Sequence, residues 1–347
     1  MSTTRGTSLN LPNRFDAQRL EAFDDGWDQP EPEFPLPQVP TEFYEDRSKS
    51  IISTNDSPDV PMEASINPYR GCEHGCAYCY ARPSHEYLGF NSAIDFESKI
   101  MVKKQAAELL RARFEKNWKP QTIMLSGNTD CYQPAERHFK ITRSLLEVLL
   151  EFRNPVAIVT KNALVTRDID ILSELATLGL VHVVLSVTTL DLELSRQLEP
   201  RTATPERKLA AIKKLTEAGI PVGVLNAPII PGLNDLEMPR ILEAAKANGA
   251  SMASYQIVRL SYGLRDIFKD WLEQHRPLEA AKVLKRIEMV RGGALTDSRF
   301  GARMNGEGAY ADYIKQQFRV HVTKYGLNCD IPELRTDLFR IPGTLFG

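Results

Sequence analysis

The chain has 347 residues, of which 42% are hydrophobic and 25% charged, and its formal net charge is −2. This composition is typical of a globular protein with a sizeable core and excludes a predominantly disordered chain. Because the charges nearly balance, there is no overall basic field of the kind that holds a nucleic acid duplex by its phosphates, although a local basic groove is still allowed.

The cysteines and the N-terminus indicate the cellular compartment. Three of the five cysteines cluster between positions 72 and 79, which favours a reducing compartment over a disulfide scaffold. Residues 1–13 are polar, without the apolar run of a signal peptide, and no stretch is long enough to cross a membrane. We therefore expect a cytoplasmic protein that is not inserted in a membrane.

Residues 1–60 form the first segment of the chain and are rich in proline and acidic residues. Prolines at this density preclude a helix or a central strand, so the segment is predicted to be an extended arm. A disordered tail is the alternative. Its aromatic residues indicate that parts of it pack on the core: Phe15, Phe23, Trp27, Phe34, Phe43 and Tyr44.

The loop at residues 70–83 carries three cysteines with the spacing C-x3-C-x2-C: Cys72, Cys76 and Cys79. Glycines at 71 and 75 allow the left-handed backbone of a tight loop that wraps one metal centre. Such thiolates suit either tetrahedral zinc or an iron–sulfur cluster. Zinc would need a fourth ligand, for which His74 and His85 are the nearest candidates. A [4Fe–4S] cluster held by three cysteines instead leaves one iron free for a cofactor.

From about residue 95, helical and buried-strand patterns alternate, which predicts an α/β fold with a parallel sheet closed or part-closed into a barrel. Helices are expected over 97–117, 135–151, 168–178, 204–218 and 236–248. Strands are expected over 121–126, 155–160, 181–188, 221–230 and 252–260. The core of this barrel is predicted to lie within residues 61–260. Residues 261–347, with helices over 264–275, 278–290 and 310–318, are predicted to form a C-terminal helical and loop extension that covers the barrel.

Polar residues follow four successive predicted strands, at residues 126–130, 160–162, 186–189 and 226. In a barrel of this kind the chemistry lies at the carboxyl ends of the strands. Strand ends are also often polar for solubility, but four ends on one rim favour a site.

With aromatic Tyr78 before its last cysteine, the cysteine motif resembles the signature of the radical S-adenosylmethionine (SAM) superfamily. Residues 63–260 are most similar to its spore photoproduct lyase-like branch. Further motifs resemble a bacterial family of radical SAM or DNA repair photolyase-like proteins of undefined substrate: Asn67-Pro68-Tyr69-Arg70-Gly71-Cys72, His85-Glu86-Tyr87, Asn128-Thr129-Asp130, Tyr132-Gln133-Pro134-Ala135-Glu136 and Ala227-Pro228.

The resemblance implies a partial (β/α)6 TIM-like barrel of the radical SAM type. This barrel would bind a [4Fe–4S] cluster through Cys72, Cys76 and Cys79, with SAM on the fourth iron. Reductive cleavage of SAM would give a 5′-deoxyadenosyl radical for hydrogen abstraction, and the electron would come from a donor such as flavodoxin or ferredoxin. By analogy, a pyrimidine lesion in DNA is a candidate substrate. The alternatives are radical SAM modification of a peptide, protein or RNA, and a non-catalytic zinc- or cluster-stabilised interaction module.

The resemblance also implies roles for five residues around SAM. Thr129 and Asp130 fall where a hydroxyl and a carboxylate approach the amino group of SAM, and Lys161 where a lysine approaches its carboxylate. Ser186 falls near the ribose or methionine portion, and Tyr78 contacts the adenine edge or shields the cluster. A zwitterionic methionine group does need one partner of each charge. The alternatives are a helix N-cap for Asp130 and a solvated loop charge for Lys161.

Cys131 lies on the rim loop where the lyase family places a thiol that returns a hydrogen atom to the product, but it is offset by several positions. The family pattern has proline here, and a buried free thiol is the alternative. Glu199 and Arg201 could serve SAM or substrate, or form an ion pair. Tyr80 could be a core-facing aromatic residue.

Overall fold

The computed structural model describes residues 5–16, 39–60, 62–297 and 299–343. Its main sheet has the strand order β10-β9-β8-β7-β6-β3-β2. Six of these strands run parallel, and β2 pairs antiparallel with β3 at one edge. The strands are β2 (Ile52–Thr54), β3 (Ala64–Ile66), β6 (Ile123–Leu125), β7 (Val156–Thr160), β8 (Val181–Ser186), β9 (Val222–Ile229) and β10 (Met252–Ile257).

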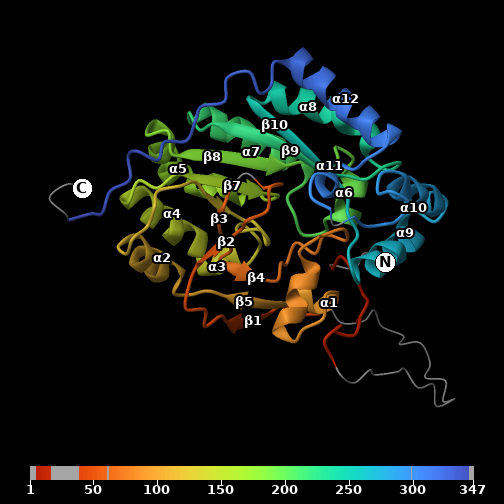
Figure 1. Cartoon of the computed structure of the whole chain (residues 1–347), viewed down its shortest axis with the longest axis horizontal. Coiled ribbons are helices and arrows are strands. Elements are labelled where there is room, and N and C mark those ends of the chain that lie inside the picture. Colours follow the sequence, from red (N-terminus) through yellow and green to blue (C-terminus); the bar gives the residue numbers. More distant parts are fainter. Residues whose placement is uncertain (1–4, 17–38, 61, 298, 344–347) are drawn as a thin grey trace.

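Helices cover the outer side of this sheet (Figure 1). Within the described ranges no pairing joins β10 to β2, so the barrel is open, and the prediction of a partial (β/α)6 barrel is confirmed. Its helices are α2 (Ala106–Phe114), α3 (Glu136–Phe139), α4 (Ile141–Glu151), α5 (Ile169–Thr177), α6 (Leu192–Leu198), α7 (Pro205–Glu217) and α8 (Met238–Ala247). The described chain also has the 3₁₀ helices η1 (Arg82–Leu88), which precedes α2, and η2 (Ala163–Asp168) and η3 (Asp235–Glu237), which lie between the later helices.

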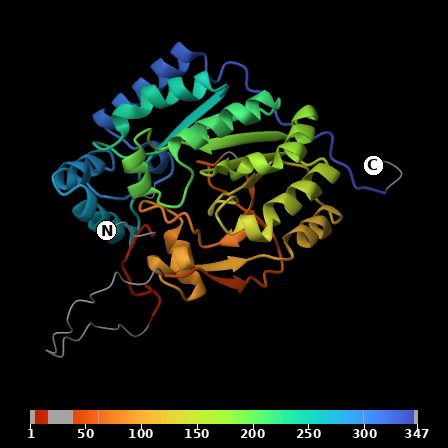
Figure 2. The same ribbon diagram turned by 180° about the vertical axis from the view of Figure 1, so that it is seen from behind.

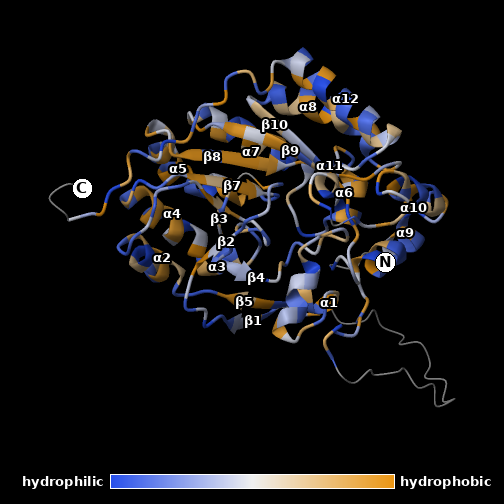
Figure 3. Cartoon of the chain, in the orientation of Figure 1, coloured by the Kyte–Doolittle hydropathy of each residue, from blue (hydrophilic) through white to orange (hydrophobic). Residues whose placement is uncertain are grey.

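Local sequence explains why these elements form. Strands β7 and β8 are rich in valine and bury alternate residues completely, and Figure 3 shows them as strongly hydrophobic elements. Helix α7 begins where the Thr204 side chain accepts a hydrogen bond from the Arg207 amide, with Pro205 in the first turn. The large core lies between the sheet and its helices.

A smaller sheet lies beside the barrel and has the order β1-β5-β4, formed by β1 (Glu42–Glu45), β5 (Lys99–Val102) and β4 (Tyr69–Arg70). Its presence corrects the predicted helix over 97–117, which is wrong in its first part. Ile100 and Val102 are buried while Lys99 and Met101 are half-buried, a period of two that suits a strand with partners on both sides. Short helix α1 (Ile94–Ser98) precedes β5.

The predicted helix over 135–151 is instead two helices. Lys140, with φ +52°, ends α3 and begins α4. A left-handed residue cannot continue an α-helix, so the chain changes direction here. The other predicted barrel strands and helices agree with the structure to within a few residues.

The described parts of the N-terminal arm are extended and packed on the core, in β1 and β2 and in aromatic contacts. The ring centroids of Phe15 and Tyr87 are 5.1 Å apart, and those of Phe43 and Phe139 are also 5.1 Å apart. Phe23, Trp27 and Phe34 lie outside the described residues.

Residues after β10 form α9 (Leu264–His275), α10 (Ala280–Met289), α11 (Ala302–Asn305) and α12 (Ala309–Tyr325). Helix α12 packs on α8, and α9 and α10 lie beside α6, as Figures 1 and 2 both show. The division of the chain at residues 60 and 260 stays a prediction. No helix among the described residues is long and apolar enough to span a membrane.

A fully buried guanidinium anchors the cysteine loop. Arg82 donates to the carbonyl oxygens of Cys76 (3.0 Å), Gly75 (3.1 Å) and Ala93 (2.9 Å), and to Oε1 of Glu97 at 2.5 Å. Both members of the Arg82–Glu97 pair are 0% exposed. The loop is therefore held by one side chain that satisfies several of its backbone acceptors.

We predict that Arg82→Met lowers the free energy of unfolding by about 3–5 kcal/mol, because it leaves the Glu97 carboxylate buried without its counter-ion. Chemical denaturation measures this. The double variant Arg82→Met/Glu97→Gln should recover part of the loss, and Arg113→Met, on an exposed arginine, is the matched control. A loss no larger than that of the control would contradict the anchoring role.

Candidate active site

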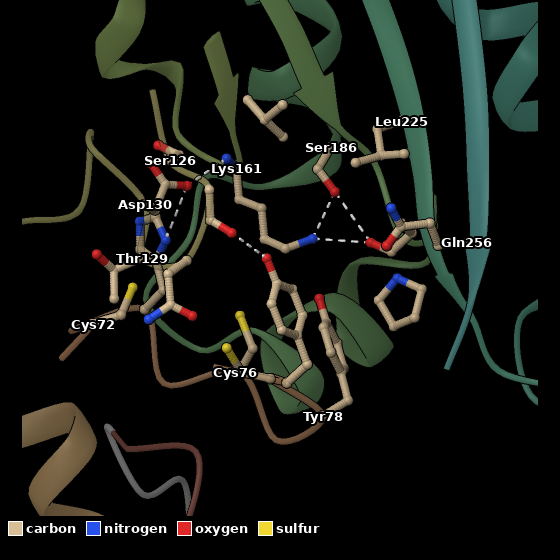
Figure 4. A pocket seen from close by; sticks show the side chains of 18 of the residues that line it. Cys72, Cys76, Tyr78, Ser126, Thr129, Asp130, Lys161, Ser186, Leu225 and Gln256 are labelled. Atoms are coloured by element: carbon tan, nitrogen blue, oxygen red, sulfur yellow. Dashed lines mark hydrogen bonds and ion pairs between the residues drawn. The ribbon is translucent and has the colours of Figure 1, made fainter. Parts of the chain in front are cut away.

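A cavity lies at the carboxyl ends of the parallel strands, bounded on its other side by the cysteine loop (Figure 4). Each of strands β6 to β10 contributes to it. The lining includes residues from the cysteine loop, from the strand ends and from α11: Cys72, His74, Cys76, Tyr78, Cys79, Tyr80, Ser126, Gly127, Asn128, Thr129, Asp130, Thr160, Lys161, Ser186, Leu225, Ala227, Pro228, Gln256, Arg259, Arg303 and Met304.

The three clustered cysteines all line this cavity. The sulfur atoms of Cys72 and Cys76 point toward it in Figure 4. Gly71 and Gly75 have φ angles of +79° and +66°, which confirms the predicted left-handed turns. Burial raises the pKa of each thiol, so the thiolates need an electropositive partner.

The donor set does not fit a closed zinc site. In the described part of the chain, no three His, Cys, Asp or Glu side chains converge closely enough to hold one metal ion. His74 lines the cavity, but its Nδ1 faces Asp130 Oδ2 at 3.4 Å and its Nε2 accepts from Asn162 Nδ2 at 3.2 Å. His85 stacks on Phe90 and is not in the lining. Three thiols that line one cavity, without a histidine free to complete a tetrahedral site, suit an iron–sulfur cluster better.

Asp130 ties the loop after β6 to the end of β7. Its Oδ1 accepts from the Tyr132 amide (2.8 Å) and the Thr160 hydroxyl (2.7 Å). Its Oδ2 accepts from the Lys161 amide at 2.7 Å. Asp130 is not a helix N-cap, because α3 begins with Ala135 in that position.

Thr129 is buried beside Asp130, and its hydroxyl donates to the Tyr69 carbonyl at 2.6 Å. Its amide donates to Asn67 Oδ1, which also accepts from the Asn128 amide. Asn67 therefore holds this turn against the strand that precedes the cysteine loop. These hydrogen bonds bring motif residue 67 into contact with motif residues 128–129, which line the cavity.

Lys161 is not a solvated charge. Its Nζ donates to the Ser186 hydroxyl at 2.7 Å and to the Ala227 carbonyl at 3.0 Å, and it lies 3.1 Å from Glu199 Oε1. Burial lowers the pKa of Lys161, but the Glu199 carboxylate more than offsets this, so the pKa is raised and the ammonium is charged.

Glu199 connects the barrel to the cysteine loop. This buried carboxylate accepts from Tyr78 Oη, from Thr188 Oγ1 at 2.5 Å and from Lys208 Nζ at 2.6 Å. Burial raises its pKa, but Lys161 and Lys208 outweigh burial and leave the pKa low. The neighbouring backbone is also joined to the loop, since the Ala77 amide donates to the Leu198 carbonyl at 3.0 Å. Glu199 therefore forms ion pairs with Lys161 and Lys208, which agrees with the ion-pair alternative that the sequence left open.

Comparisons with known proteins address the family. A model of the radical SAM superfamily matches residues 66–245. An uncharacterized protein of Mycobacterium tuberculosis is 31% identical over 312 residues, which cover 88% of each chain. An uncharacterized protein of Methanocaldococcus jannaschii is 32% identical over 172 residues, which cover 50% of this chain and 62% of that one.

The chain belongs to the radical SAM superfamily. It is an enzyme of the radical SAM type, and enzymes of this type use a [4Fe–4S] cluster and SAM. Among solved structures, a spore photoproduct lyase variant with bound AdoMet and dinucleoside spore photoproduct has a TM-score of 0.60 at 17% identity, over 82% of this chain and 80% of that one. At this identity the likeness shows a shared fold.

Among the predicted site residues, Cys131 is the one that does not line the cavity. It is 0% exposed, belongs to the main core and is absent from the cavity lining. A hydrogen donor has to reach the cavity, so this placement favours the buried-thiol alternative. The catalytic role of Cys131 stays a prediction.

Several residues that line the cavity were not predicted from the sequence. Gln256 and Arg259 come from the end of β10, and Met304 from α11. Tyr80 is not a core residue, because it is 43% exposed and donates to the Gly127 carbonyl at 2.7 Å. The position of Gln256 and Arg259 after the last barrel strand could have indicated them, whereas nothing in the sequence places α11 at this rim.

We predict that Glu199→Gln lowers the free energy of unfolding by about 3–5 kcal/mol at neutral pH, because Lys161 and Lys208 lose their shared counter-ion. Since the folded pKa of Glu199 is lowered, its contribution is complete above about pH 4.5, the usual glutamate value, and is lost as pH falls through the folded pKa. Denaturation at a series of pH values should show this acid-side loss in the parent but not in Glu199→Gln. Glu206→Gln, on an exposed glutamate, is the control. Equal profiles for all three proteins would contradict this account.

Proposed function

We propose that the chain binds a [4Fe–4S] cluster through Cys72, Cys76 and Cys79 and uses it to cleave SAM reductively. The observation that carries the proposal is that all three thiols of the C-x3-C-x2-C loop line one cavity at the carboxyl ends of the parallel strands. Bound there, the reduced cluster would supply one electron to the sulfonium of SAM, giving a 5′-deoxyadenosyl radical for hydrogen abstraction from the substrate. The protein supplies binding, orientation and exclusion of water.

The side chains proposed to contact SAM lie around the same cavity. Lys161 is 18% exposed, so a carboxylate from the cavity could replace one of its hydroxyl partners. Ser186 is one of those partners and would then be free to bond SAM. The Tyr78 hydroxyl donates to Glu199, and the Lys161 ammonium lies 5.5 Å from the centroid of the Tyr78 ring. These two contacts fix the ring beside Cys79. Thr129 and Asp130 are proposed to border the amino group.

Enzymes of this type need an electron donor, and we propose a flavodoxin or a ferredoxin. A pyrimidine lesion in DNA is the first substrate to test, because a fold neighbour was solved with a dinucleoside spore photoproduct. Modification of a peptide, protein or RNA is the alternative, and the low identity to that neighbour leaves both classes open. Cytoplasmic residence is part of the proposal.

We predict that Cys72→Ala, Cys76→Ala and Cys79→Ala each prevent retention of the cluster, because three thiolates cannot spare one. Anaerobic reconstitution followed by iron and sulfide analysis measures this. Cys329→Ala, at an exposed cysteine far along the chain, should keep the iron content of the parent. The parent should also form 5′-deoxyadenosine from SAM with a chemical reductant, and the three variants should not. Stoichiometric iron in the variants would refute the ligand assignment.

We predict that Lys161→Met and Asp130→Asn weaken SAM binding by roughly ten- to a hundredfold and leave iron content unchanged. Loss of one charge-assisted contact costs about 1.5–3 kcal/mol. For Asp130→Asn an additional cause is that the amide cannot accept from both the Lys161 amide and the Thr160 hydroxyl. Calorimetric SAM titrations of the reconstituted proteins provide the measurement. Affinities equal to that of the parent would remove both residues from the SAM site.

A further inference from the structure

The charges that line the cavity are unequally paired. Its basic side chains are His74, Lys161, Arg259 and Arg303. Both ring nitrogens of His74 already have partners, since Nδ1 lies 3.4 Å from Asp130 Oδ2 and Nε2 accepts from Asn162 Nδ2 at 3.2 Å. Lys161 pairs with Glu199 at 3.1 Å, and Arg303 Nε pairs with Asp59 Oδ2 at 2.5 Å. Two of the three remaining cations are thus already neutralised by carboxylates of the protein.

Arg259 differs from the others. It is half-buried, and among the described residues its guanidinium has neither a hydrogen bond nor an ion pair. Asp59 is the carboxylate that acts on it at longer range, but the oxygens of Asp59 already accept from Arg303 and from the Gly301 amide at 2.7 Å. A partly desolvated guanidinium without an acceptor is unfavourable, and an anion would satisfy it.

Neighbouring residues orient this cation toward the cavity rim. The Arg259 guanidinium lies 5.0 Å from the centroid of the Tyr80 ring, and Tyr80 is fixed by its bond to the Gly127 carbonyl. Stacking on a ring occupies a face of the guanidinium and leaves the N–H groups at its edge available. Gln256, three residues earlier, extends from β10 into the cavity (Figure 4), and its side-chain amide has no hydrogen bond within the described part of the chain.

We propose that Arg259, assisted by Gln256, binds one anionic group, a phosphate or a carboxylate, of the substrate. This proposal rests on the proposed function, since it assumes that the same cavity holds SAM on its cysteine side. Lys161 is the cation on that side, because it lies over Tyr78 of the cysteine loop. Arg259 lies instead against an exposed ring and beside α11 at the rim, where a second molecule would enter.

The number of free cations limits the kind of substrate. A duplex held along its backbone needs several lysines or arginines that are free to contact phosphates. Among the described residues that line the cavity, Arg259 is the one such cation, and the net charge of the chain is −2. We therefore infer a substrate that presents a single anionic group at the rim.

The test uses the reconstituted full chain with saturating SAM and an oxidised cluster, so that no turnover occurs. Inorganic phosphate and acetate are titrated separately, with binding followed by ³¹P and ¹³C NMR. Arg259→Gln is expected to weaken binding of the preferred anion at least tenfold, and Arg259→Lys, which keeps the charge but not the planar fork, less so. Arg265→Gln removes the same charge at an exposed position outside the cavity and should match the parent. All four proteins should bind SAM within about twofold of one another.

The two anions distinguish a phosphate group of the substrate from a carboxylate group. Tighter binding of phosphate indicates a phosphorylated substrate, and tighter binding of acetate indicates a carboxylate. Equal anion binding by parent and Arg259→Gln would overturn the proposal, as would a tenfold loss of SAM affinity in Arg259→Gln, which would assign Arg259 to SAM. If anion binding depends on Arg259 but the parent forms no 5′-deoxyadenosine when reduced, the proposed function fails and the anion site stands.

Discussion

The buried guanidinium of Arg82 holds the cysteine loop in the shape that the rest of the site requires. A loop that presents three thiols to a cavity has to turn most of its carbonyl groups away from that cavity and into the protein, where each needs a donor. Arg82 supplies donors for the carbonyls of Gly75 and Cys76, and Glu97 neutralises the charge. Glu97 also accepts from the Gly6 amide at 2.7 Å, so the N-terminal arm shares the same anchor. The glycines at 71 and 75 make the turns, and the ion pair keeps them in place.

The opposite face of the loop is joined to the barrel by Glu199. One carboxylate binds a tyrosine of the loop, a lysine at the end of β7 and a lysine of α7, so the loop, a strand end and a helix form one connected polar network. Breaking a buried network of this kind is costly because each remaining group loses its partner in a region without water. The cavity therefore lies between these two anchors, with the thiols on the side of the cysteine loop and Arg259, which has no ion pair among the described residues, at its rim. This arrangement suits chemistry that needs a dry, rigid site.

Much of the fold followed from the sequence because periodicity reports burial directly. The valine-rich strands 155–160 and 181–188 and the capped helix after Thr204 are examples of local patterns that agree with the tertiary structure. The strand at residues 99–102 was missed because one of its partners, β1, lies far away in the sequence and the other, β4, is very short. Motif spacing and strand ends placed the cysteines and residues 129, 130, 161 and 186 around one rim, and in the structure they line one cavity, although their roles stay predictions. Arg259 follows the last barrel strand and could have been indicated in the same way, whereas the contribution of α11 depends on how the C-terminal segment returns to the rim, which no local pattern contains. The pairing of Lys161 with Glu199 likewise depends on packing.

The central claim is that three cysteines hold a cluster whose remaining iron is open to SAM. It is tested most directly by electron paramagnetic resonance of the anaerobically reconstituted, reduced protein before and after SAM is added. The account predicts the signal of a reduced [4Fe–4S] cluster whose g values shift when SAM binds, because the added ligand changes the environment of one iron. A protein that binds zinc in place of iron, or a cluster signal that saturating SAM leaves unchanged, would contradict it.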